Sequence, residues 1–121
     1  MSPEILNSHA SPKVAVARDL SVWVETRHLG AVYTDRTRLS SIEADLTAEP
    51  DVVVLLFKSI EAGIVRLVPG AGGGERNYVE IEGAADIVVE VVSNSSEHKE
   101  WERLFERYFL AGVREYWICD A

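Results

Sequence analysis

The sequence of 121 residues predicts an α/β domain with a mixed central β-sheet flanked by helices. The strongest evidence lies near its end, where a run of β-branched residues at 87–92 precedes an amphipathic segment and a second apolar run at 115–119. A strand, a crossover helix and another strand predict a right-handed βαβ unit with parallel strands. The remaining elements are expected to complete the sheet and cover its faces.

Composition and length indicate one domain over residues 1–121, with 47% apolar and 26% charged residues. No segment approaches the roughly 20 apolar residues that cross a bilayer, and no signal peptide begins the chain. We therefore expect a cytoplasmic protein.

The net charge of −8 is unevenly distributed. Residues 1–39 carry five basic and four acidic side chains, so residues 40–121 carry seven basic and sixteen acidic ones. Because non-specific binding to nucleic acid depends on basic surface, this charge argues against a protein that coats DNA. It does not exclude a nuclease whose carboxylates are neutralised by metal ions.

The first predicted element is a helix. Ser11 followed by Pro12 is typical of an N-cap and a first helical position, and Gly30 is the expected stop. Residues 1–11 contain small and polar residues and are predicted to be poorly ordered or to form a loop.

Strands are predicted next, as short pieces at 31–34 and 37–39 and a strong strand at 52–57. Pro50 favours an extended entry, so Asp51 is expected where that strand begins. Residues 58–63 are expected to form a helical turn.

Residues 64–68 and 78–82 are predicted to pair across the glycine-rich segment 69–77. That segment has neither the P-loop lysine followed by serine or threonine nor the full dinucleotide fingerprint, so we interpret it as a connector.

In the strand at 86–92, alternation places Asp86, Val88 and Glu90 on one face. A carboxylate inside an aliphatic strand is costly unless it has a partner, a proton or a metal ion, so Glu90 is the first functional candidate. Asp86 either assists a metal ion or has a structural role at the strand entrance, and the structural interpretation is favoured.

The following helix is expected to begin at the cap formed by Asn94 and Glu97 and to end at Gly112. Its aromatic residues and those of the last strand are interpreted as core rather than as stacking platforms. The one cysteine, Cys119, is interpreted in the same way.

The segments ADIVVEVVSNSS and YFLAGVREYWICDA resemble the signature of the Uma-type restriction endonuclease family, a bacterial family of the PD-(D/E)XK nuclease superfamily. The earlier segments EADLTAEPDVVV and GIVRLVPG and the opening MSPE with His9 resemble one subgroup. This resemblance implies a restriction-endonuclease-like core. Members usually continue with further β structure, so a C-terminal truncation stays open.

The resemblance implies that Asp51 and Glu90 bind Mg²⁺ or Mn²⁺ and that a lysine assists catalysis. In the superfamily pattern a lysine follows the second acid by two residues, and here Val92 occupies that position. Most members of the resembling family instead have a lysine in the following helix, and here Leu104 occupies that position. Lys99 is the remaining candidate, with a solvated helix lysine as the alternative. His9 matches a family position, and a surface histidine is its alternative.

The predicted function is therefore a metal-dependent endodeoxyribonuclease that hydrolyses phosphodiester bonds, with DNA as substrate and Asp51, Glu90 and Lys99 as catalytic residues. The alternative is a catalytically inactive nuclease-fold domain that acts as an interaction or dimerisation module. Exposed strand edges are natural sites of self-pairing, so a homodimer is expected.

Overall fold

A computed structural model describes residues 3–34, 36–68, 79–92 and 98–120. The elements in chain order are α1 (Pro3–Thr26), β1 (Gly30–Tyr33), β2 (Thr37–Ser41), β3 (Leu46–Ala48), β4 (Val52–Leu56), α2 (Phe57–Glu61), β5 (Val65–Val68), β6 (Val79–Gly83), β7 (Ile87–Val92), α3 (His98–Leu110) and β8 (Glu115–Asp120). The predicted mixed α/β class is confirmed.

The strands form two mixed sheets of four strands each, in the orders β1-β4-β7-β8 and β3-β2-β6-β5. β7 and β8 are parallel and joined through α3, as the βαβ prediction required. β5 and β6 pair, as predicted, and their orientation is antiparallel. β3 was not predicted, because its three residues are too few to show a pattern.

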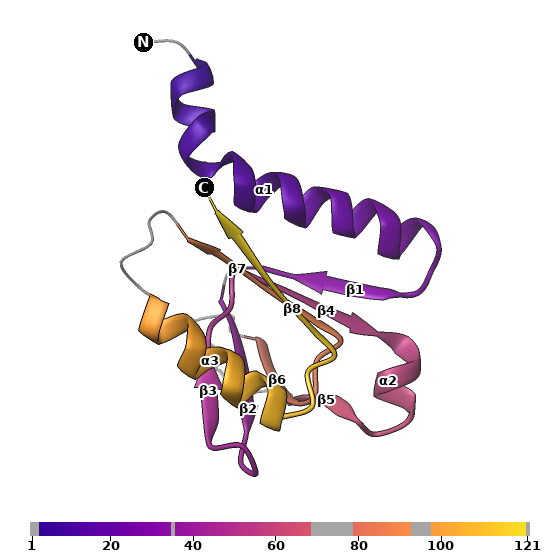
Figure 1. The fold of residues 1–121 in the computed structure, drawn as a ribbon. Helices are drawn as coiled ribbons and strands as arrows, with labels where there is room; N and C mark the ends of the chain where they lie inside the picture. The colour runs from indigo at the N-terminus through magenta and orange to yellow at the C-terminus, as the bar shows by residue number, and fades with distance from the viewer. Residues whose placement is uncertain (1–2, 35, 69–78, 93–97, 121) are drawn as a thin grey trace.

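β4 and β7 lie in the middle of the first sheet and are covered on both faces. Leu20 and Val24 of α1 pack on one face, against Val52, Val54 and Val89. The other face packs against α3 and the second sheet. Figure 1 shows α1 and α3 on opposite sides of this sheet. This double coverage explains why both strands are nearly continuous aliphatic runs.

The prediction that the first helix begins at Ser11 and Pro12 was wrong. α1 begins at Pro3 and contains Pro12 in its interior. A proline inside a helix removes one backbone hydrogen bond and bends the helix without always ending it, and Figure 1 shows α1 changing direction along its length.

The end of α1 also differs from the prediction. His28, rather than Gly30, takes the left-handed conformation of the cap, with φ 54°. Gly30 begins β1 instead, where a Cβ would lie 2.0 Å from the Leu55 carbonyl oxygen. Glycine is therefore needed there for close approach of two strands.

The C-terminal cap of α3 is as predicted. Gly112 has φ 88°, and the Val113 N–H donates to the Tyr108 carbonyl at 3.0 Å. This cap turns the chain from α3 into β8 and so sets how α3 lies on the sheet. None of the helices in the described part of the chain has the length and apolar character that a membrane span requires.

Candidate metal site at the β4–β7 pair

The antiparallel register of β4 and β7 brings Asp51 and Glu90 together. Val52 pairs with Val89 and Val53 with Val88, so the next step of the same ladder sets Asp51 opposite Glu90. Residues directly opposite in an antiparallel pair have side chains on the same face, about 5 Å apart at Cβ. Two carboxylates far apart in the chain therefore lie together at one end of the central β4–β7 pair.

Asp51 is held by contacts to both of its carboxylate oxygens. Oδ2 accepts a hydrogen bond from the Val91 backbone N–H at 2.7 Å. Oδ1 lies 3.6 Å from the Lys13 ammonium of α1, and both side chains are about one-third exposed. The carboxylate is thus oriented by the neighbouring strand and balanced by a cation from the covering helix.

Glu90 is harder to ionise than an ordinary glutamate. Its pKa is raised from 4.5 to about 7, chiefly by burial and also by the nearby Asp51 carboxylate. A hydrogen bond from the Tyr108 hydroxyl to Oε2, at 3.1 Å, partly offsets that rise, as does one that the carboxylate accepts from the Asp51 backbone. Near neutral pH a proton and a cation would therefore compete for Glu90.

Tyr108 projects from α3 and is fully buried. Burial, followed by the neighbouring Glu90 carboxylate, raises the pKa of its hydroxyl, so Tyr108 stays protonated and donates to Glu90. Sequence periodicity predicted Tyr108 as a core residue, which is correct for its ring. The role of its hydroxyl was missed, because periodicity does not indicate what lies opposite a buried polar atom.

Tyr116 of β8 lies beside Tyr108, with ring centroids 4.9 Å apart. Its buried hydroxyl makes no hydrogen bond within the described residues. Burial raises the pKa of this hydroxyl, and the Glu90 carboxylate raises it further. The predicted core position of Tyr116 is therefore correct for its ring, and its hydroxyl adds a second phenol near Glu90.

The lysine of the site is the least defined of its predicted members. Lys99 lies in the first turn of α3, and its side chain is outside the described residues. Leu104 packs against the core. Lys13 lies near Asp51 and was not predicted from the sequence. A lysine on an amphipathic helix is an ordinary surface residue, and nothing in the residues around it indicates a contact with a distant strand.

Asp86 is not part of this group. Its carboxylate accepts hydrogen bonds from the Leu56 N–H and the Ser59 hydroxyl, each at 2.8 Å, where β4 passes into α2. These contacts support the structural interpretation. Cys119 packs on the α1 side of the sheet as predicted. The side chain of His9 and the glycine-rich segment 69–77 lie outside the described residues.

The chemistry of the site suits a small divalent cation with oxygen ligands. Mg²⁺ usually takes one or two carboxylates from a protein and keeps several waters. Asp51 and Glu90 provide two, and the described residues contain no larger group of three or more histidine, cysteine or acidic ligands. The donor set therefore fits Mg²⁺ or Mn²⁺ better than a metal that requires a closed protein cage.

Comparison with known proteins agrees with this architecture. No curated protein matches the chain. A crystal structure from Anabaena variabilis ATCC 29413, described as "a putative nuclease belonging to DUF820", superposes with a TM-score of 0.64 at 18% identity. The match covers 93% of this chain and 56% of the other, so the present chain spans little more than half of that protein, and the likeness concerns the fold.

A family model, Uma2, described as "Putative restriction endonuclease", matches residues 1–121. The match includes both acidic residues of the β4–β7 pair and the whole βαβ unit. The family description supports a nuclease function in general, and restriction-endonuclease-like families generally use divalent metal ions. The chain belongs to the Uma2 family of restriction-endonuclease-like proteins.

Proposed function

We propose that this protein is a Mg²⁺- or Mn²⁺-dependent endodeoxyribonuclease that hydrolyses phosphodiester bonds. The observation that supports this most is the position of Asp51 opposite Glu90, with the pKa of Glu90 raised to about 7. Two carboxylates side by side in a half-buried position repel each other when both are ionised, which costs stability unless a cation is present. A cation would relieve their repulsion.

In this proposal Asp51 and Glu90 hold the ion, and the other residues orient them. The Val91 N–H and the Tyr108 hydroxyl keep the two carboxylates directed to the same place. When bound, the ion would supply Lewis-acid stabilisation of phosphate charge and a more acidic water.

A lysine is proposed to orient the attacking water or to stabilise the phosphate charge. Lys99 is the candidate that the family resemblance suggests. Lys13 is a second candidate, because its ammonium lies 3.6 Å from Asp51. Substituting each lysine by glutamine separates the two, since only the catalytic one should reduce nicking without reducing metal binding.

Calorimetry with Mg²⁺ and Mn²⁺, combined with plasmid nicking on the same samples, tests the function. We expect wild type to bind and nick and Glu90→Gln to do neither. Glu82→Gln, on β6 in the second sheet, is a control that removes one negative charge and should behave as wild type. A folded wild type that binds neither ion would contradict the proposal.

A second candidate function is an interaction or dimerisation module, and exposed apolar side chains near β8 favour it. β8 is an edge strand of the first sheet. Phe105 and Phe109 of α3 stack on each other and are 53% and 70% exposed, and Ile118 of β8 is 42% exposed. Such a surface beside an unpaired edge is suited to a homodimer.

Light scattering tests the homodimer directly. We expect twice the monomer mass for wild type and monomers for Phe109→Glu. A dimer that binds no metal would favour the module, whereas a dimer that nicks DNA would combine both proposals. A wild type that remains monomeric at high concentration would exclude the homodimer.

A further inference from the structure

A second polar site lies beside the candidate metal site, between α3 and the turn that joins β2 to β3. It is a pocket of about 220 Å³. Its walls are Asp45, Leu46, Thr47, Arg103, Leu104 and Arg107. Two guanidinium groups and one hydroxyl are hydrogen-bond donors, and the two leucines form an apolar part of the wall. This combination suits an anionic ligand, and none of the roles proposed above uses it.

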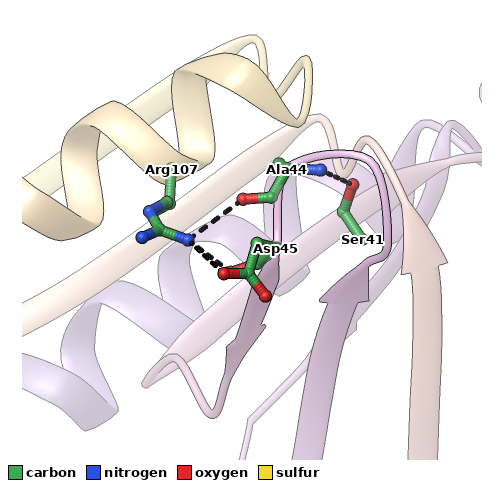
Figure 2. A network of polar contacts seen from close by, with 4 residues as sticks. All are labelled: Ser41, Ala44, Asp45 and Arg107. Carbon is green, nitrogen blue, oxygen red and sulfur yellow. Dashed lines mark hydrogen bonds and ion pairs between the residues drawn. The ribbon is translucent and has the colours of Figure 1, made fainter.

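Arg107 contacts the turn through only one of its nitrogens. Nη1 donates to the Asp45 carbonyl at 2.6 Å, to the Ala44 carbonyl at 3.3 Å and to the Asp45 carboxylate at 3.1 Å, as Figure 2 shows. Nε and Nη2 make no hydrogen bond within the described part of the chain. The guanidinium therefore keeps donors of the planar fork that binds phosphate well.

The Asp45 carboxylate is weakly held in its place. The side chain of Asp45 is 94% exposed, and exposed ion pairs contribute only about 0–1 kcal/mol. The turn itself is closed by other bonds, from the Asp45 N–H to the Ile42 carbonyl at 3.1 Å and from the Ala44 N–H to the Ser41 hydroxyl at 3.3 Å. An anionic ligand can thus replace this carboxylate without opening the turn.

The pocket is close to the candidate metal site along two elements. On α3, Leu104 of the pocket lies four residues, about 6 Å along the axis, before Tyr108, which donates to Glu90. On the other side, Thr47 precedes Asp51 by four residues, which span at most about 14 Å. A nucleic-acid strand at Asp51 and Glu90 would pass within reach of the pocket.

We infer that this pocket binds a phosphodiester group of the nucleic-acid backbone, next to the one that is cleaved. Arg103 and Arg107 donate to the phosphate oxygens, and when nucleic acid is absent the Asp45 carboxylate accepts from Nη1 of Arg107. The inference rests on the proposed nuclease function. It also explains how a chain with a net charge of −8 attracts a polyanion, since binding then depends on a local basic pocket.

Fluorescence anisotropy with a labelled DNA duplex in EDTA, over roughly 50–200 mM salt, tests the pocket without cleavage. We expect Asp45→Asn to tighten binding several-fold, because it removes the competing charge and asparagine tolerates the left-handed backbone at this position. Arg103→Gln, at an exposed position, should weaken binding and lower the salt slope by about 0.9.

Arg66→Gln is the matched control. Arg66 lies on β5, which is at the opposite edge of the second sheet from β3. Its guanidinium forms an ion pair with Glu82 of β6 at 2.8 Å. Equal losses for Arg103→Gln and Arg66→Gln would overturn the site, because general electrostatics would then account for both. Unchanged binding by Asp45→Asn would overturn the exchange of carboxylate for phosphate.

Two further results distinguish this inference from the nuclease proposal. If the binding differences hold while wild type nicks no DNA with Mg²⁺ or Mn²⁺, the pocket stands and the nuclease proposal fails. If wild type nicks DNA and Arg103→Gln binds it with an unchanged salt slope, the pocket fails and the nuclease stands. Inorganic phosphate that binds as tightly as the duplex would overturn the assignment to a nucleic-acid backbone.

Discussion

Asp86 and Glu90 lie four residues apart on the same side of β7, and their surroundings are opposite. Asp86 is only 4% exposed, yet its carboxylate accepts two hydrogen bonds from neutral donors. Glu90 is less completely buried, but it faces a second carboxylate across the β4–β7 pair and has a raised pKa. The depth of burial alone therefore does not separate a structural carboxylate from a functional one. The neighbouring donors and charges do.

The largest expected effect is the loss of Asp86. Asp86→Ala should reduce the free energy of unfolding by about 2–4 kcal/mol, because it leaves a backbone N–H and the buried Ser59 hydroxyl without an acceptor. Urea unfolding followed by circular dichroism measures this. Ser59→Ala removes only one of the two donors and should cost less. If Asp86→Ala lowers the free energy of unfolding by less than about 1 kcal/mol, the hydrogen bonds of Asp86 do not give it the structural role that distinguishes it from Glu90.

Glu90→Gln should have the opposite effect on stability. Its folded-state pKa of about 7 lies above the ordinary 4.5, so the protonated carboxyl favours the folded state at pH 4, and this contribution is lost as the pH rises through 7. In EDTA at pH 8 the glutamine variant should be more stable than wild type, by at most about 3 kcal/mol.

Urea unfolding of both proteins at pH 5 and pH 8 measures that difference. The gap between wild type and variant should be smaller at pH 5, where Glu90 is protonated in the folded state. A gap that does not change with pH would show that the charge of Glu90 is not what destabilises the site. Glu82→Gln should show no comparable gap, because Glu82 pairs with the Arg66 guanidinium rather than facing a second carboxylate.

Tyr108→Phe should sharpen the contrast by raising the pKa of Glu90 further above its ordinary value. The phenol donates to Glu90 and lowers its pKa, so its removal should raise the pH at which Mg²⁺ binds half-maximally. Calorimetric titrations of Mg²⁺ between pH 6 and 8.5 measure the shift. An unchanged pH midpoint would contradict the proposed coupling of Tyr108 to metal binding, whatever the effect on stability.

Lys13→Gln is expected to have the smallest effect on stability, below about 0.5 kcal/mol, because the pair with Asp51 is partly exposed. Mg²⁺ affinity should rise modestly, since a competing cation is removed from Asp51. If Lys13 also contacts substrate, nicking should fall in spite of that tighter binding. Lower Mg²⁺ affinity in the variant would instead indicate that Lys13 orients Asp51.

Much of the region around the site could be predicted from local patterns. β-branched alternation predicted that Val88 and Glu90 share a face of β7, and glycine at position 112 predicted the cap that ends α3. Asp51 was correctly expected at the start of β4. The family resemblance, not the pattern, joined Asp51 to Glu90 as a pair.

Other features could not be predicted, because they depend on contacts between distant segments. The bend of α1 at an internal proline, the separation into two sheets, and the approach of Lys13 to Asp51 leave no periodic mark in the sequence. The pocket between α3 and the β2–β3 turn could not be predicted either, because Arg107 and Asp45 come into contact only when α3 packs against that turn.

The sequence by itself determined most of the longer strands and helices, though neither β3 nor the start of α1, and which carboxylate is costly to bury, because these properties depend on neighbours within one or two turns. Only the tertiary structure decided that Glu90 faces Asp51 and Tyr108 while Asp86 faces Leu56 and Ser59. The physical reason is the register of the antiparallel β4–β7 pair, which long-range packing sets. A shift of one residue in that register would turn Asp51 away from Glu90.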